Sequence, residues 1–133
     1  MLMAVLSVNL FADVKFSKEE NDQMFNTQIK KIKLENNFPQ KVDDHIYWID
    51  LYANNKGALV YEYQIVKNLN QTQIKEYNKH LNSTLLSAYC NDKSIYEVIM
   101  VRNKRDINII YRYEGENLAF IKVNKEICKK YRK

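Results

Sequence analysis

Residues 45–67 read HIYWIDLYANNKGALVYEYQIVK, and this stretch decides the fold class. Its first half, residues 45–55, is rich in β-branched and aromatic residues, which favour strands. The second half alternates, so that one face carries Leu59, Tyr61, Tyr63 and Ile65. NNKG at residues 54–57 supplies the asparagine and glycine that tight turns need. We therefore predict a β-hairpin here.

A second hairpin is predicted near the end of the chain. DINIIYRY, residues 106–113, alternates apolar and polar side chains, as a half-buried strand does. The turn EGEN follows at residues 114–117, and LAFIKV, residues 118–123, returns as the partner strand.

Three segments are predicted to be helices. Residues 17–37 place apolar side chains near one face, and Pro39 follows them. Residues 71–89 have apolar side chains at helical spacing, after Asn70 as a cap with Gln73 three residues later. Residues 92–102 could be a strand or a helix, and we favour the helix, with Asn103 as its left-handed cap.

These elements together indicate an α+β fold. We expect a four-stranded, mainly antiparallel sheet made of the two hairpins, with the helices packed on one face. The order would be helix–hairpin–helix–helix–hairpin. A chain of 133 residues with 46% apolar residues suits one domain with one core, which we place at residues 13–133.

The first twelve residues, MLMAVLSVNLFA, carry no charged side chain and are mostly apolar. They are too short to span a bilayer, which takes about 20 residues. They fit the apolar part of a secretory signal peptide cleaved after Ala12, and a buried N-terminal strand or helix is the alternative. The signal-peptide interpretation predicts a periplasmic or secreted protein with no transmembrane segment.

Export bears on the two cysteines, because disulfides persist in oxidising compartments. Cys90 and Cys128 allow one pairing, which would close a loop of about 39 residues and contribute about 4 kcal/mol. A metal site would need more ligands than the sequence offers. A thiol nucleophile would need a base; neither histidine is near in sequence, but contact in space stays open.

Little else in the sequence indicates chemistry. Asp43, Asp44 and His45 are adjacent, and adjacent side chains diverge on extended backbone, so we expect a polar loop and no metal site. His80 is expected on a helix surface. No cofactor and no catalytic residue are predicted.

The net charge of +5 and the lysine-rich C-terminus would permit binding of single-stranded nucleic acid on the sheet. Export instead favours a solvated basic face with a frayed tail.

Four stretches carry a resemblance: FPQKVDDHIYW, GALVYEYQI, the helix into AYCND, and IIYRYEGENLAFIKVNKEIC. Their order resembles small exported bacterial proteins with one disulfide, and loosely the periplasmic pilotins of type II secretion. The resemblance covers most of residues 38–128 and implies a non-enzymatic periplasmic accessory protein. No cysteine lies at the expected cleavage site, so the lipid anchor usual in pilotins is not expected.

The leading hypothesis is therefore a binding protein that docks a protein partner in the periplasm or cell envelope. The docking surface would be the groove between helix 71–89 and the sheet, or an exposed strand edge. The candidate anchors, each of which could instead pack across strands, are Trp48, Tyr61, Tyr63, Tyr111 and Tyr113. The alternatives are an exported inhibitor or immunity-type protein that inserts the NNKG or EGEN loop into an enzyme, and an enzyme with an unrecognised site at His45 or His80.

Overall fold

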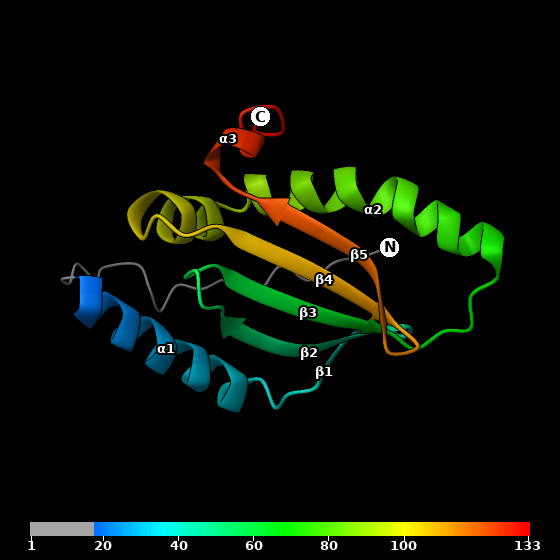
Figure 1. Cartoon of the computed structure of the whole chain (residues 1–133), viewed down its shortest axis with the longest axis horizontal. Coiled ribbons are helices and arrows are strands. Elements are labelled where there is room, and N and C mark those ends of the chain that lie inside the picture. Colours follow the sequence, from blue (N-terminus) through cyan, green and yellow to red (C-terminus); the bar gives the residue numbers. More distant parts are fainter. Residues whose placement is uncertain (1–17) are drawn as a thin grey trace.

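The computed structural model describes residues 18–133 and is drawn in Figure 1. The signal-peptide prediction for residues 1–12 therefore falls outside the described residues. The helices and strands, in chain order, are α1 (Lys18–Glu35), β1 (Gln40–Asp43), β2 (Ile46–Ala53), β3 (Leu59–Ile65), α2 (Gln71–Asn91), η2 (Ile95–Arg102), β4 (Ile107–Tyr113), β5 (Glu116–Val123) and α3 (Lys125–Cys128).

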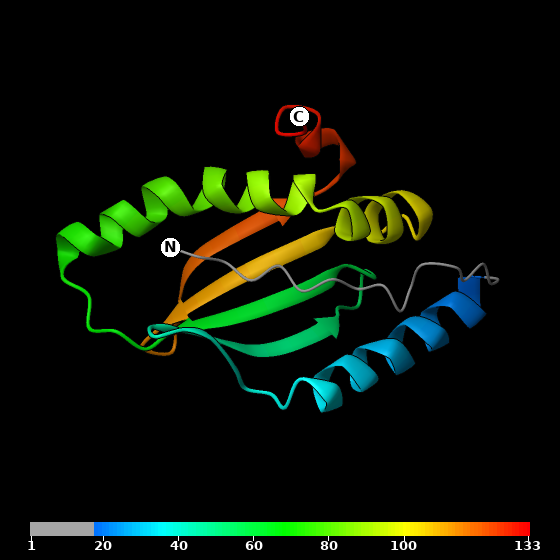
Figure 2. The ribbon, with the colours of Figure 1, turned by 180° about the vertical axis from the view of Figure 1, so that it is seen from behind.

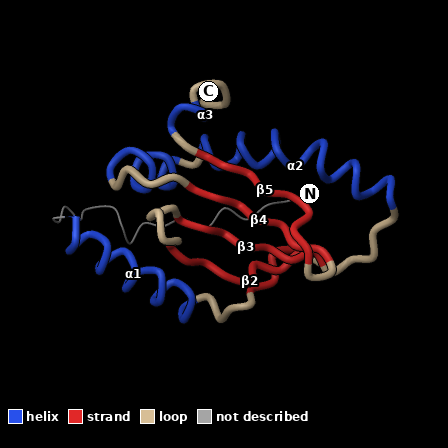
Figure 3. Tube along the Cα trace, in the orientation of Figure 1, coloured by secondary structure: helices blue, strands red, loops and turns tan. Residues whose placement is uncertain are grey.

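The sheet has five strands in the order β1-β2-β3-β4-β5, and it is mixed. Figure 3 shows β2 to β5 side by side. The two predicted hairpins are present as β2–β3 and β4–β5. They join through a parallel pair, β3 with β4, in which Leu59 lies opposite Ile107 and Ile65 lies opposite Tyr113. The predicted four-stranded, mainly antiparallel sheet is therefore wrong. The physical reason is the long connection through α2 and η2, which returns the chain to the end of the sheet where β3 began.

The fifth strand, β1, was not predicted. It has four residues, QKVD, and pairs antiparallel with β2, with Gln40 opposite Trp48. So short and polar a segment has no alternation from which a strand could be recognised. It extends the first hairpin into a three-stranded meander.

A bulge in β2 keeps its apolar side chains on the core face. The pairing with β3 shifts between Trp48 and Asp50, so that Trp48 lies opposite Tyr63 and Leu51 lies opposite Tyr61. An extra residue in one strand changes the alternation from that point on. Leu51 is consequently buried, while Asp50 is partly exposed and forms an ion pair with Lys33 of α1.

The two long helices lie along opposite edges of the sheet (Figure 2). Helix α1 packs against β2, and α2 packs against β5. Asn70 caps α2 as predicted: its side chain accepts a hydrogen bond from Gln73 N, and the Gln73 side chain accepts one from Asn70 N. Both helices contribute to one core, α1 through Phe25, Ile29 and Ile32.

The predicted helix at residues 92–102 is instead a π-helix over Ile95–Arg102. Its end also differs from the prediction, because Asn103 has φ −94° and Lys104 takes the left-handed position with φ 53°. The Asn103 and Arg105 amides donate to the Val98 and Ile99 carbonyls and close this end. The turn brings Lys104 and Arg105 to the start of β4.

Candidate partner-binding groove

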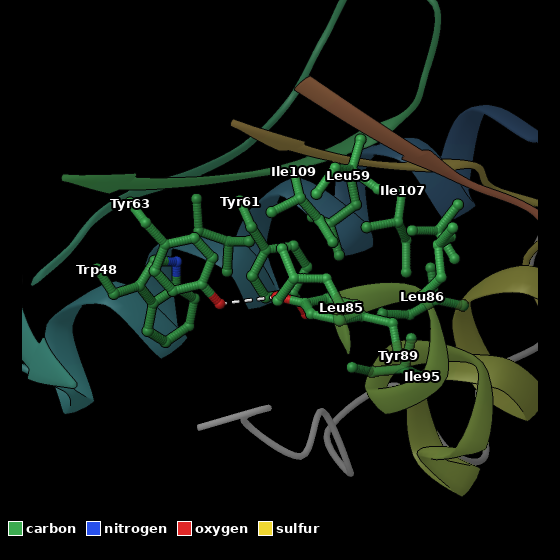
Figure 4. Close-up of a cluster of buried hydrophobic side chains, with 14 of the residues drawn as sticks. Trp48, Leu59, Tyr61, Tyr63, Leu85, Leu86, Tyr89, Ile95, Ile107 and Ile109 are labelled. Carbon is green, nitrogen blue, oxygen red and sulfur yellow. Dashed lines mark hydrogen bonds between the residues drawn. The ribbon is translucent and has the colours of Figure 1, made fainter. Parts of the chain in front are cut away.

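Four of the five predicted anchor residues lie inside the molecule. Trp48, Tyr61, Tyr63 and Tyr111 are at most 1% exposed and belong to the aromatic part of the core. Figure 4 shows the first three of them. Tyr113 is half-buried, and its hydroxyl accepts a hydrogen bond of 2.8 Å from Leu69 N. The structure thus places the first four in cross-strand packing, the alternative role that the sequence offered for each of them.

This aromatic core is closely packed but incompletely hydrogen-bonded. Trp48 stacks on Tyr61 at 5.6 Å between ring centroids, and Tyr89 of α2 meets Tyr61 edge-on at 5.3 Å. The hydroxyls of Tyr63 and Tyr89 share a hydrogen bond of 2.7 Å. Among the described residues, the Trp48 Nε1, Tyr61 hydroxyl and Tyr111 hydroxyl groups have no partner. Burial raises the pKa of the Tyr61 and Tyr89 hydroxyls well above the ordinary tyrosine value.

The surface best suited to a partner lies at the sheet edge formed by β5. A sheet has two edge strands, and each presents backbone groups that another strand can pair with. The other edge, β1, has only four residues, two of which are the charged Lys41 and Asp43. These features discourage pairing there. β5 is the longer of the two edge strands, with eight residues.

A groove of about 590 Å³ runs beside β5, and we call it the edge groove. Its apolar floor comes from Leu86 of α2, Ile121 of β5 and Ile127 of α3. Polar and charged side chains form the rim, and Phe120 on β5 is 58% exposed there. The complete lining is Asn82, Leu86, Phe120, Ile121, Lys122, Glu126, Ile127, Lys130 and Tyr131.

Helix α3 forms one wall of this groove, and a disulfide holds it in place. Cys90 at the end of α2 and Cys128 of α3 are joined, with their Cα atoms 5.3 Å apart, in the pairing that the sequence predicts. Both cysteines are fully buried. The bond ties the C-terminal part of the groove to the helix that forms its opposite wall.

The C-terminal tail is also held by hydrogen bonds, contrary to the frayed tail expected from the sequence. The Asn91 side chain donates to the Tyr131 carbonyl at 2.7 Å, and Arg132 donates to the Cys90 carbonyl at 2.9 Å. The Arg132 guanidinium lies 3.6 Å from the centroid of the Tyr96 ring. The lysines of this tail are therefore carried on an ordered segment beside the groove.

The two histidines lie elsewhere. The His80 ring is 2.8 Å from Glu76 on the exposed side of α2, and the His45 backbone amide donates to the Asp43 carboxylate at 2.7 Å.

Within residues 18–133, no three potential metal-ligating side chains gather in one place. No helix of that described region is long and apolar enough to cross a bilayer.

Comparisons with known proteins give one likeness of fold. No family model matches the chain, and no curated protein matches it. A solved structure from Pseudomonas aeruginosa, described as a "putative secreted protein", superposes with a TM-score of 0.61 at 10% sequence identity. The match covers 86% of this chain and 99% of that one. At this identity the likeness extends to the fold alone, and it does not support a similarity to pilotins in particular.

Proposed function

We propose that this chain is a small periplasmic or secreted accessory protein, without catalytic activity, that binds a protein partner along the edge groove. The single observation that carries the proposal is the combination of the eight-residue edge strand β5 with an apolar-floored groove beside it. Added strands bind through backbone hydrogen bonds, and adjacent pockets that accept side chains make such binding specific.

Two observations support an exported protein. A buried disulfide joins Cys90 and Cys128, and disulfides are typical of oxidising compartments. The fold is similar to that of the Pseudomonas aeruginosa protein whose description includes secretion. Together with the apolar sequence of residues 1–12, these observations favour a protein that leaves the cytosol.

The proposed partner contact can be tested with two matched substitutions. Phe120→Glu places a charge at the edge groove, whereas Leu34→Glu makes the same kind of change at an exposed site on α1, where Leu34 is 79% exposed. The bait proteins are immobilised and exposed to a periplasmic or culture-medium extract of the native host. We expect the wild type and Leu34→Glu to retain the same partner and Phe120→Glu to lose it.

Equal capture by both variants would contradict docking at the edge groove. Circular dichroism and urea unfolding of each bait exclude a folding defect as the cause of lost capture. Intact-mass analysis of the protein recovered from the host reports whether residues 1–12 have been removed and whether the thiols are oxidised.

The inhibitor alternative rests on a different surface, the turn between β4 and β5. Glu114 and Gly115 both have positive φ, and a Cβ built at Gly115 would meet no atom within 4 Å. The turn is thus free to enter a cleft of another protein. A stable one-to-one complex with a hydrolase that Glu114→Lys weakens and Phe120→Glu leaves intact would favour the inhibitor over the accessory protein.

A further inference from the structure

A second hollow, of about 490 Å³, opens at the end of the sheet where the β2–β3 turn meets the start of β4. We call it the basic hollow. It borders the edge groove only at Phe120 and Lys122. Its lining is Asn54, Asn55, Lys56, Gly57, Ala58, Lys104, Arg105, Asp106, Asn108, Phe120 and Lys122.

Arg105 fixes the shape of the basic hollow by joining two loops and a helix. Its Nη1 donates to the Gly57 carbonyl at 2.8 Å, and its Nη2 forms an ion pair with Asp22 of α1. The guanidinium also lies 3.9 Å from the centroid of the Phe25 ring. Arg105 is therefore held in place, with its side chain 8% exposed.

Gly57 allows this close approach. It has φ +82°, and a Cβ at this position would lie 3.3 Å from Arg105 Nη1. The Asn54 side chain accepts hydrogen bonds from the Lys56 and Ala58 amides, both at 3.0 Å, and so completes the turn. Hydrogen bonds from Arg105 and to Asn54 therefore hold the backbone at the rim of the basic hollow in place.

The charge of the lining is unbalanced in favour of cations. Lys56, Lys104 and Lys122 line the hollow together with one carboxylate, Asp106, while the charge of Arg105 is already paired with Asp22. Asp106 is 3.8 Å from Lys122, which is too far for a hydrogen bond. Among the described residues, Lys56 and Lys104 make no ion pair. A concave surface with mostly one sign of charge attracts ligands of the opposite sign.

Two other lining residues indicate which neutral groups the ligand carries beside its negative charge. Asn108 on β4 lines the hollow with a side-chain amide, a group that both donates and accepts hydrogen bonds and so suits a ligand hydroxyl. Phe120 offers an exposed aromatic face at the rim. The volume exceeds that needed for an inorganic anion and lies in the range of small-molecule sites.

We propose that the basic hollow binds a small sugar that carries a phosphate or carboxylate group. The lysines Lys56, Lys104 and Lys122 hold the charged group through charge-assisted hydrogen bonds. The Asn108 amide exchanges a hydrogen bond with a sugar hydroxyl, and Phe120 contacts the apolar face of the ring. This site shares Phe120 and Lys122 with the edge groove, but the lysines Lys56 and Lys104 belong to the basic hollow alone.

The test is an NMR titration of the full chain, in which backbone amide shifts are followed. The probes are glucose 6-phosphate, glucuronate and, as the neutral control, glucose. We expect saturable shifts at residues 54–58, 104–108 and 120–122 for at least one of the two anions, and none for glucose. The comparison of the two anions decides between phosphate and carboxylate.

Two lysine variants separate the basic hollow from the edge groove. Lys104→Met, which alters only the hollow, is expected to raise the Kd of the bound anion about two- to fivefold. Lys130→Met, which alters only the groove, is expected to leave that Kd unchanged. Equal effects of the two variants, shifts scattered over all lysine-bearing surfaces, or equal binding of glucose would overturn the proposal, whatever the outcome of partner capture.

Discussion

The hydroxyls of Tyr63 on β3 and Tyr89 on α2 lie 2.7 Å apart in the core, and their hydrogen bond joins the sheet to the helix. Tyr61, two residues before Tyr63, is equally buried, but its hydroxyl has no partner among the described residues. The two tyrosines of this strand are therefore equally buried, but only the Tyr63 hydroxyl makes a hydrogen bond.

This difference predicts opposite responses to loss of a hydroxyl. Tyr89→Phe would leave the Tyr63 hydroxyl buried and unpaired, and we expect it to lower the free energy of unfolding by about 1–3 kcal/mol. Tyr61→Phe removes a hydroxyl that makes no hydrogen bond, and we expect a change near zero or a slight gain. Urea unfolding at pH 7 measures both values. A larger loss in Tyr61→Phe than in Tyr89→Phe would contradict the hydrogen-bond assignment.

The buried tyrosines also predict a loss of stability at alkaline pH. Burial raises the pKa of Tyr61, Tyr63, Tyr89 and Tyr111 above the ordinary value near 10. Above pH 10 the unfolded chain therefore releases protons that the folded chain keeps, and the free energy of unfolding falls. Each such tyrosine lowers the free energy of unfolding by about 1.4 kcal/mol per pH unit in that range, and it has no effect below about pH 9.

Urea midpoints measured from pH 8 to 11 check this prediction. Tyr61→Phe serves as the control, because it removes one of the four groups and should make the decline above pH 10 less steep. Absorbance of tyrosinate near 295 nm should show the buried tyrosines titrating only as the chain unfolds. A stability that stays flat up to pH 11 would contradict the prediction.

The hairpins could be predicted from the sequence because their signals are local. Alternation in residues 59–65 and the turn at residues 54–57 lie within one short stretch. The parallel pairing of β3 with β4 depends on where α2 and η2 return the chain, and local alternation carries no information about that. The α+β class was thus within reach of the sequence, whereas the number of strands and the parallel pair were not.

The candidate surfaces were harder to predict, because each combines residues that are far apart in the sequence. The edge groove combines residues of α2, β5 and the C-terminal segment, which are far apart in sequence. Alternation does place Phe120 and Lys122 on the face opposite the buried Ile121, but it cannot say that β5 is an edge strand. The disulfide was predictable because two cysteines allow one pairing.

An ion pair on the sheet predicts a further stability effect. Arg112 donates to Glu62 at 2.6 Å between adjacent strands, and the Glu62 side chain is only 9% exposed. Arg112→Met would leave this carboxylate without its cation, and we expect a loss of about 2–3 kcal/mol, moderated because Arg112 is partly exposed. The measurement is urea unfolding at pH 7.

Two controls accompany the Arg112 variant. Lys31→Met removes the exposed pair with Glu35, in which both side chains are 55% exposed, and should change stability by less than about 0.5 kcal/mol. Adding Glu62→Gln to Arg112→Met removes the buried charge and should recover part of the loss. If the double variant is no more stable than Arg112→Met, the unpaired carboxylate is not the cause.

The disulfide links stability to the proposed binding surface. Cys90 and Cys128 are 38 residues apart, and a loop of this size predicts that reduction costs about 4 kcal/mol, since the unfolded chain regains conformational freedom. The same bond holds α3, which carries Ile127 and Glu126 of the edge groove. Reduction is therefore expected to weaken partner capture even at temperatures where the protein remains folded.

Cys90→Ala/Cys128→Ala and dithiothreitol-treated wild type test this link in parallel, by urea unfolding and by partner capture. Sugar-anion binding at the basic hollow supplies the internal control, because none of its lining residues belongs to α3 or the tail. We expect capture to fall while that binding persists in the folded fraction. Should capture survive the loss of the disulfide unchanged, α3 would have no part in the partner contact, and the docking surface would have to lie on β5 and α2 alone.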